Sequence, residues 1–103
     1  MEKKSIRKAY GRALADYGAE NTDVVVVVAD VSASVQTRFF AERFPERFFN
    51  VGITEQALVD FAAGLALGGM IPFANTFAVL FLRAAEQIRT SVAYAKTNVK
   101  LVG

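Results

Sequence analysis

The sequence has no cysteine and no histidine among its 103 residues. Without cysteine, the chain forms no disulfide, has no thiolate nucleophile and holds no zinc through sulfur. Without histidine, it lacks the commonest general base, the Ser-His-Asp arrangement and the commonest metal ligand. Any proton transfer by this chain must therefore use carboxylate, tyrosine or lysine side chains, or groups that another chain supplies.

The sequence also has little charge imbalance. Twelve basic and ten acidic residues give a net charge of +2 and are mixed along the chain, so no basic block indicates nucleic acid. Arginines do alternate with phenylalanines over residues 38–49, which could suggest base stacking. Because Glu42 and Glu46 interrupt that pattern, we interpret it as buried phenylalanines beside a solvated charged face and expect no nucleic-acid partner.

Hydrophobic residues make up 53% of the chain, which is high for a small domain and suggests that some of them face a partner. Residues 61–82 contain no ionisable side chain and are long enough to span a bilayer. Gly68, Gly69 and Pro72 interrupt this stretch, so we predict a helix, a turn, a strand, a turn and a helix there. Residues 1–8 carry several charged side chains and no apolar segment follows them, so we expect no signal peptide. We also expect a cytoplasmic protein without a membrane partner.

The hydrophobic pattern predicts alternating helices and strands. The helices are expected over residues 5–18, 34–44, 54–67 and 77–95, and the strands over 24–29, 48–51, 70–74 and 99–103. The valines at 24–28 are apolar on both faces, as in a central parallel strand covered by helices. We therefore predict an α/β fold, a three-layer parallel sheet with helices on both faces. Because the chain stops at its last strand, we expect residues 1–103 to be one incomplete domain.

Polar side chains follow the valine strand. Asp30, Ser32 and Ser34 lie where its carboxyl end is expected, and ligands gather at such ends in open α/β sheets. Asp30 could instead simply end the strand while a serine caps the next helix. Position alone leaves both interpretations open.

Glu55 is the second candidate, because it falls in the first turn of an apolar helix. An acid there offsets the positive end of the helix dipole by about 0.3–1 kcal/mol. Alternatively, it is a carboxylate shielded from water that shares a proton with a ligand nitrogen. The helix is apolar or small on most sides, so we expect one side to face another subunit and Glu55 to lie at that boundary.

Residues 48–66, Phe-Phe-Asn-Val-Gly-Ile-Thr-Glu-Gln-Ala-Leu-Val-Asp-Phe-Ala-Ala-Gly-Leu-Ala, resemble the core motif of the pyrimidine-binding domain of transketolases. Three flanking segments agree: Val-Ala-Asp-Val-Ser-Ala-Ser (28–34), Pro-Phe-Ala-Asn-Thr-Phe-Ala (72–78) and Arg-Ala-Ala-Glu-Gln-Ile-Arg-Thr-Ser-Val-Ala-Tyr (83–94). The resemblance covers nearly the whole chain. It is strongest to the C-terminal subunit of split, two-chain transketolases, of which this would be the N-terminal part.

The resemblance implies a thiamine diphosphate cofactor. In that family, the residue that matches Glu55 hydrogen-bonds the aminopyrimidine ring and promotes its reactive tautomer. Phe77 matches an aromatic residue that packs on the pyrimidine, and Phe81 lies near enough to help. Asp30 matches an aspartate near the cofactor. The spacing between Phe77 and Arg83 is one residue shorter than the resemblance implies.

The resemblance also implies a substrate and a partner. Arg7 and Ser34 match an arginine and a serine that hold the sugar phosphate, a sound pairing for a phosphate group. The family's diphosphate-binding signature is absent from this sequence, so the ligands of its Mg²⁺ or Ca²⁺ ion are expected on a partner subunit. No metal ligand is assigned to this chain. Self-association into a heterotetramer is also expected.

The function that these resemblances imply is that of a transketolase component of the pentose phosphate pathway. Such an enzyme transfers a two-carbon ketol unit from a ketose phosphate to an aldose phosphate, and this chain would act only with its partner. Deoxyxylulose-phosphate synthase and the β chain of a 2-oxo acid dehydrogenase carry similar motifs, although residues 93–100 resemble transketolase more. A non-catalytic assembly module is the third alternative.

Overall fold

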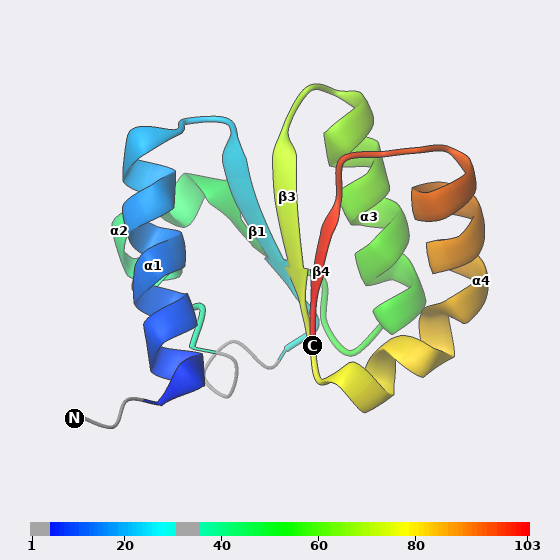
Figure 1. The fold of residues 1–103 in the computed structure, drawn as a ribbon, viewed down its shortest axis with the longest axis horizontal. Coiled ribbons are helices and arrows are strands. Elements are labelled where there is room, and N and C mark those ends of the chain that lie inside the picture. Colours follow the sequence, from blue (N-terminus) through cyan, green and yellow to red (C-terminus); the bar gives the residue numbers. More distant parts are fainter. Residues whose placement is uncertain (1–4, 31–35) are drawn as a thin grey trace.

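The computed structural model describes residues 5–30 and 36–103 of the chain (Figure 1). In chain order, the elements are α1 (Ile6–Glu20), β1 (Val24–Val28), α2 (Arg38–Arg43), η1 (Pro45–Arg47), β2 (Phe48–Asn50), α3 (Glu55–Leu67), β3 (Ile71–Asn75), η2 (Ala78–Ala84), α4 (Ala85–Gln87), η3 (Ile88–Tyr94) and β4 (Lys100–Val102). The expected alternation of helix and strand is confirmed. Part of the helix expected at 34–44 lies outside the described residues, and α2 begins at Arg38.

The four strands form one parallel sheet in the order β2-β1-β3-β4. The register pairs Val26 of β1 with Phe48 of β2 and with Phe73 of β3. Because the strands are parallel, their carboxyl ends share one edge of the sheet, which is the lower edge in Figure 1. The predicted parallel α/β sheet is therefore confirmed, with β1 in an interior position.

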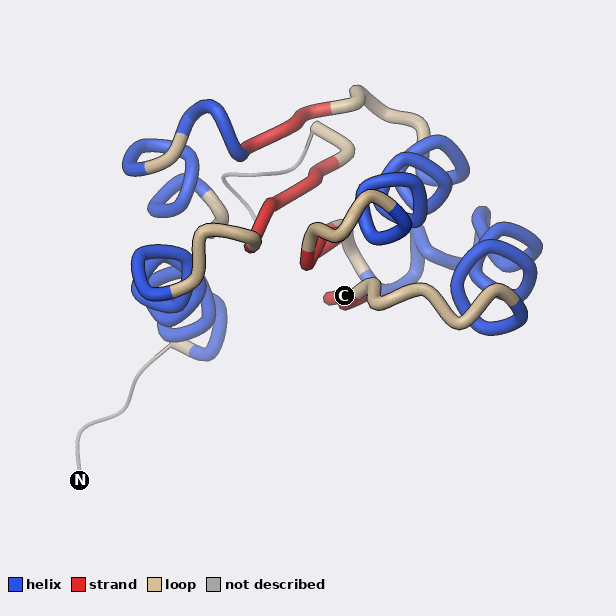
Figure 2. Tube along the Cα trace, turned by 90° about the horizontal axis from the view of Figure 1, so that it is seen from above, coloured by secondary structure: helices blue, strands red, loops and turns tan. Residues whose placement is uncertain are grey.

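Helices cover the two faces of the sheet separately (Figure 2). Alternate valines of β1 point to opposite sides, since strand side chains alternate between faces. Val24, Val26 and Val28 pack with Leu14 of α1 and Phe40 of α2. On the other face lies a second cluster, drawn from β1 and the residue after it, α3, β3 and η2: Val27, Ala29, Leu58, Val59, Ala62, Ala74, Phe81 and Ala84. The three-layer prediction is thus also confirmed.

Helix α1 begins where the sequence predicts, because the Ser5 hydroxyl accepts a hydrogen bond from the Lys8 amide at 3.4 Å. It does not end at Gly18 but continues to Glu20. The Arg47 guanidinium donates to the carbonyls of Gly18 at 2.9 Å and Asn21 at 3.2 Å, and so satisfies acceptors at the helix end. Gly18 instead allows close packing, since a Cβ there would lie 2.5 Å from the Phe40 ring.

The prediction of one long α-helix over residues 77–95 is wrong, because the helical type changes along this segment. The segment contains a 3₁₀ helix (η2), one α turn (α4) and a π helix (η3). In the π segment, the amide of Ala95 donates to the Thr90 carbonyl, five residues back, at 3.2 Å. A nearly all-round apolar sequence indicates helix but carries no information on pitch. With this winding, Phe81 belongs to the core cluster, and Ile88 and Val92 pack against it.

The stretch without ionisable residues, 61–82, forms the end of α3, the strand β3 and the start of η2. The predicted helix, turn, strand, turn and helix are therefore confirmed. Within residues 5–30 and 36–103, no helix has the length and apolar character needed to cross a bilayer.

The close contact between α1 and α2 can be tested at Gly18. We expect Gly18→Ala to lower the free energy of unfolding by about 1–2 kcal/mol, because the clash with Phe40 outweighs the gain in helix propensity. Gly64→Ala in α3 is the matched control, since a Cβ there meets nothing within 4 Å. That variant should raise the free energy by about 0.5–1 kcal/mol. Urea unfolding measures both, and equal effects would contradict the packing described here.

Candidate functional site

A tight turn places the start of α3 beside the carboxyl ends of β1 and β2. Gly52 adopts a φ of 77°, a left-handed conformation that favours glycine. The Asn50 side-chain oxygen accepts from the amides of Gly52 and Asp30, both at 3.0 Å. The Thr54 hydroxyl donates to the Val51 carbonyl at 3.1 Å. These bonds fix the position of Glu55, the first residue of α3.

The Glu55 side chain is turned inward and is only 3% exposed. Its Oε1 accepts a hydrogen bond from Arg83 Nη1 at 3.1 Å. Its Oε2 is also buried and has no hydrogen-bond partner among the described residues. Leaving a buried acceptor unsatisfied costs about 1–3 kcal/mol, more than an acid at a helix start gains from the dipole. The dipole alone therefore does not account for this carboxylate.

Arg83 is a site residue that sequence reasoning missed. Its side chain is 65% exposed, and its carbonyl accepts from Gln56 Nε2 at 3.1 Å. Arg83 thus ties η2 to the first turn of α3. The sequence feature that could have identified Arg83 is its position as the first charged residue after the stretch 61–82. A hollow of about 710 Å³ opens here, lined by Ile53, Thr54, Glu55, Gln56, Ala57 and Arg83.

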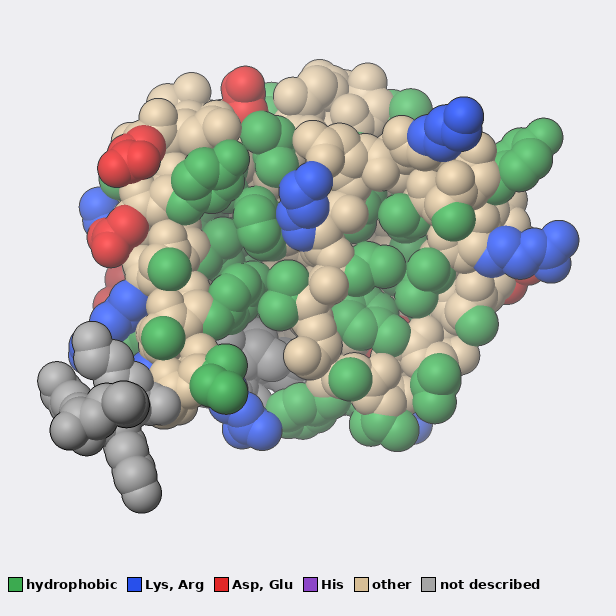
Figure 3. Space-filling view, viewed as in Figure 1, with side chains coloured by type: hydrophobic (Ala, Val, Ile, Leu, Met, Phe, Trp, Pro, Cys, Tyr) green, Lys and Arg blue, Asp and Glu red, His purple; other side chains and the backbone are tan. Residues whose placement is uncertain are grey.

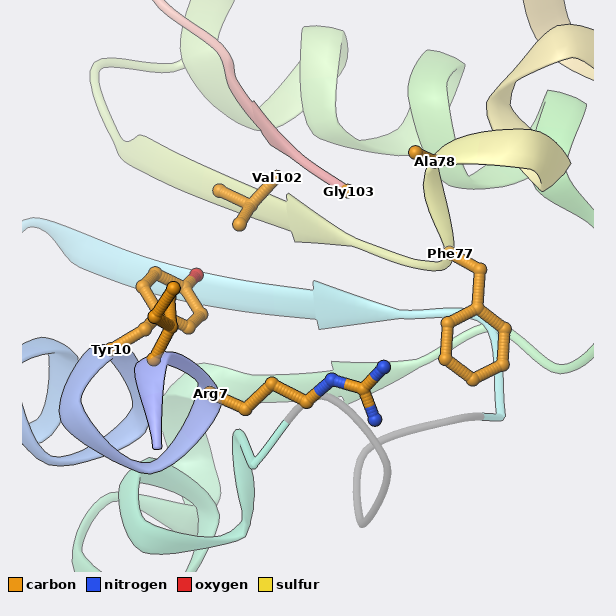
Figure 4. Close-up of a pocket in the computed structure, with 7 residues that line it drawn as sticks. Arg7, Tyr10, Phe77, Ala78, Val102 and Gly103 are labelled. Atoms are coloured by element: carbon orange, nitrogen blue, oxygen red, sulfur yellow. The ribbon is translucent and has the colours of Figure 1, made fainter. Parts of the chain in front are cut away.

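A second cavity, of about 310 Å³, lies at the same edge of the sheet (Figure 4). It is lined by residues from α1, from the segment after β3 and from the end of β4: Ile6, Arg7, Tyr10, Phe77, Ala78, Val102 and Gly103. Figure 4 shows the Arg7 guanidinium extending toward the Phe77 ring. The structure therefore brings together two of the predicted site residues, an exposed cation and an aromatic ring.

Tyr10 and Asn75 are joined behind this cavity by a hydrogen bond that the sequence did not predict. The Tyr10 hydroxyl donates to Asn75 Oδ1. Burial raises the pKa of the Tyr10 phenol well above its usual range, although the bond to Asn75 opposes the shift. The phenol is protonated at neutral pH, as an ordinary tyrosine is, and burial favours this neutral donor form further. The only sequence signal was an asparagine at the end of an apolar strand.

The remaining predicted residues are more dispersed. Asp30 is exposed at the end of β1 with a φ of 59°, and its carboxylate accepts from Asn50 Nδ2 at 3.3 Å. Phe81 is 9% exposed and belongs to the core cluster with Leu58 of α3, so its burial needs no ligand. Ser34, like Ser32, lies outside the described residues. Among residues 5–30 and 36–103, no three carboxylates gather to hold a metal ion.

A buried carboxylate, an arginine and an aromatic ring along the carboxyl edge of a parallel α/β sheet form an arrangement typical of small-molecule-binding domains of the open-sheet class. The family comparison is more specific. Residues 2–103 match the model of the transketolase pyrimidine-binding domain. The chain belongs to this family, and the resemblance found in the sequence is confirmed.

Two relatives and one solved structure show the extent of the match. A putative transketolase C-terminal section of Methanocaldococcus jannaschii is 50% identical over 100 residues, which are 96% of this chain and 32% of that protein. A 1-deoxy-D-xylulose-5-phosphate synthase of Mycobacterium sp. (strain KMS) is 40% identical over 94 residues, 91% of this chain and 15% of that protein. A structure described as a split gene transketolase, inactive β4 tetramer, superposes with a TM-score of 0.84 at 56% identity, over 92% of this chain and 32% of that chain.

The chain therefore spans about a third of the Methanocaldococcus jannaschii protein and of the solved structure, and less of the synthase. It corresponds to the N-terminal portion of a split transketolase's C-terminal section.

The pairing of Glu55 with Arg83 can be tested by unfolding. We expect Arg83→Met to lower the free energy of unfolding by about 1–3 kcal/mol, toward the lower value because Arg83 is largely exposed. Adding Glu55→Gln should recover most of this loss, because a neutral amide is easier to bury than an unpaired carboxylate. Strictly additive effects of the two substitutions in urea denaturation would contradict the pairing.

Proposed function

We propose that this chain supplies the pyrimidine-binding part of a thiamine-diphosphate-dependent transketolase. The enzyme would transfer a two-carbon ketol unit from a ketose phosphate to an aldose phosphate, in a complex with a partner chain. The observation that carries the proposal is the buried Oε2 of Glu55, which lacks a partner among the described residues. A ligand nitrogen that shares a proton with this oxygen would satisfy it.

Glu55 is well suited to that task. Arg83 holds Oε1, so the carboxylate has a fixed orientation and a single oxygen left for the ligand. Its shielding from water strengthens a hydrogen bond to a ring nitrogen. The chemistry that thiamine diphosphate supplies when bound is a nucleophilic carbon for addition to the ketose carbonyl. The role of Glu55 is to hold a proton at the aminopyrimidine nitrogen.

Aromatic residues would complete the pyrimidine site. Phe77 is partly exposed in the cavity beside Arg7 and offers a ring face for the aminopyrimidine. Phe81, which the resemblance also assigns to the cofactor, would act from the core, where it joins Leu58 in supporting α3. Asp30 stays a candidate at the neighbouring strand end.

Arg7 is the proposed anchor for the substrate phosphate. Its guanidinium reaches into the cavity at the carboxyl edge of the sheet, and an arginine can bind phosphate through two parallel hydrogen bonds. Ser34 is proposed as the second phosphate ligand on the basis of the resemblance. Together they would place a sugar phosphate at the edge of the sheet that carries Glu55.

Exposed apolar side chains support the need for a partner. Ile53, Val79 and Leu82 are each at least two-thirds exposed, and Ile53 lines the Glu55 hollow. Figure 3 shows further hydrophobic side chains between α1 and β4. We propose that a partner subunit covers the Glu55 side and brings the diphosphate-binding half with its Mg²⁺ or Ca²⁺ ligands. Two such pairs would associate into a heterotetramer. The related solved structure is described as an inactive β4 tetramer, which agrees with self-association and not with the partner's presence.

We expect Glu55→Ala to lower turnover in the reconstituted complex at least about 100-fold, because no carboxylate then shares the proton at the aminopyrimidine nitrogen. The fold should change little, since the substitution also removes a poorly satisfied buried group. Asp60→Asn, an exposed carboxylate on the same helix, is the matched control and should retain activity. Ketol transfer from xylulose 5-phosphate to ribose 5-phosphate is the assay. Full activity in the Glu55 variant would refute the proposal.

The same assay separates the alternative function. Because a deoxyxylulose-phosphate synthase is among the relatives, the complex is also supplied with pyruvate and glyceraldehyde 3-phosphate. If the complex is a transketolase, it should form product from xylulose 5-phosphate and none from pyruvate. Consumption of pyruvate would favour the synthase or a dehydrogenase component. The chain without its partner should convert neither substrate pair, and no product from the reconstituted complex would favour an assembly module.

A further inference from the structure

The N-terminal turns of α1, which carry Arg7, have little packing of their own. Residues 5–9 are all exposed, and Ile6 is 87% exposed. Going along the helix, Tyr10 and Gly11 are the first residues that are partly or fully buried. The position of this end of α1 relative to the sheet therefore depends on the buried side of the helix that follows, of which Tyr10 is the first residue.

Tyr10 contacts a side chain whose orientation is fixed. Asn75 is fully buried at the end of β3, and its Nδ2 donates to the Phe73 carbonyl at 2.7 Å and the Val27 carbonyl at 3.4 Å. Both of its donors are thus used within the sheet, and Oδ1 must face Tyr10 as an acceptor. The Tyr10 hydroxyl therefore donates to a rigid partner that belongs to β3 and is held by the carbonyl of its neighbour β1.

This bond joins the two walls of the Arg7 cavity. Arg7 lies three residues before Tyr10, one turn away on the same side of α1. Phe77 lies two residues after Asn75, on the opposite wall. A shift of α1 away from β3 would move the guanidinium relative to the ring and to any phosphate between the two walls.

We propose that Tyr10 and Asn75 form a positioning pair, which holds Arg7 at the distance from β3 that phosphate binding requires. The proposal rests on the proposed role of Arg7 in binding the substrate phosphate. Tyr10 is not a catalytic residue here, since it acts through the placement of α1. Because of this pair, the affinity of the site for a phosphate group depends on the hydroxyl of Tyr10, which does not itself bind the phosphate.

The test is a double-mutant cycle on phosphate affinity in the complex with the partner chain. Isothermal titration measures the binding of ribose 5-phosphate, inorganic phosphate and ribose to the wild type, Tyr10→Phe, Arg7→Ala and the double variant. We expect Tyr10→Phe to weaken binding of both phosphate ligands about 5-fold, the effect of one neutral hydrogen bond. Binding of ribose should not change, whereas a general loss of structure would weaken all three ligands.

In the Arg7→Ala background, Tyr10→Phe should have no further effect, because its action runs through Arg7. Tyr17→Phe, two turns further along α1 and partly exposed, is the matched control and should bind like the wild type. Equal weakening by Tyr10→Phe with and without Arg7 would overturn the proposal, as would wild-type affinity in Tyr10→Phe.

The outcome is separable from the proposed function. If Arg7→Ala leaves phosphate binding unchanged, the substrate role of Arg7 is wrong and the positioning pair falls with it. If Arg7→Ala weakens binding while Tyr10→Phe does not, only the positioning pair is wrong. Turnover is not part of the measurement, so an absence of ketol transfer would not alter the result.

Discussion

The five valines of β1 are buried on both faces, and the rest of the structure depends on this constraint. A strand that is apolar on both sides needs helices above and below it, and here it also has parallel neighbours on both edges. Parallel neighbours must all end at the same edge, so each crossover begins there. That is why Glu55, at the start of α3, and Phe77, just after β3, share an edge. Arg7 reaches the same edge because α1 runs back toward the start of β1.

The free-energy gain from the helix dipole and the cost of burying the carboxylate can be compared at Glu55. A dipole partner at a helix start contributes about 0.3–1 kcal/mol and functions well in water. Burying the carboxylate with one oxygen unpaired costs more than that, so the domain would be more stable with an exposed acid at this position. Arg83 offsets part of the cost by binding Oε1. The remaining oxygen therefore supports the proposal that Glu55 binds a ligand, since its burial does not contribute to stability.

The sequence predicted the parallel sheet and the place of Glu55 because each depends on a local pattern. Valines on both faces of a strand and an acid before an apolar run can both be recognised without tertiary information. The roles of Arg7 and Phe77 came from family resemblance, and the structure places the two in one cavity. The bonds from Arg83 to Glu55 and from Tyr10 to Asn75 could not be predicted, because periodicity indicates which face is buried but not which distant side chains meet.

The 3₁₀ winding of η2 could not be predicted either, yet it determines how far apart two residues of the candidate site lie, Phe77 and Arg83. Phe77 directly precedes this segment and lies beside the Arg7 cavity, and Arg83, in its last turn, is bound to Glu55. From Phe77 to Arg83, a 3₁₀ helix rises about 12 Å, whereas an α-helix rises about 9 Å. This extra length of about 3 Å is twice the rise of one α-helical residue. The 3₁₀ winding therefore lets one short segment reach from the aromatic wall of the Arg7 cavity to the buried carboxylate.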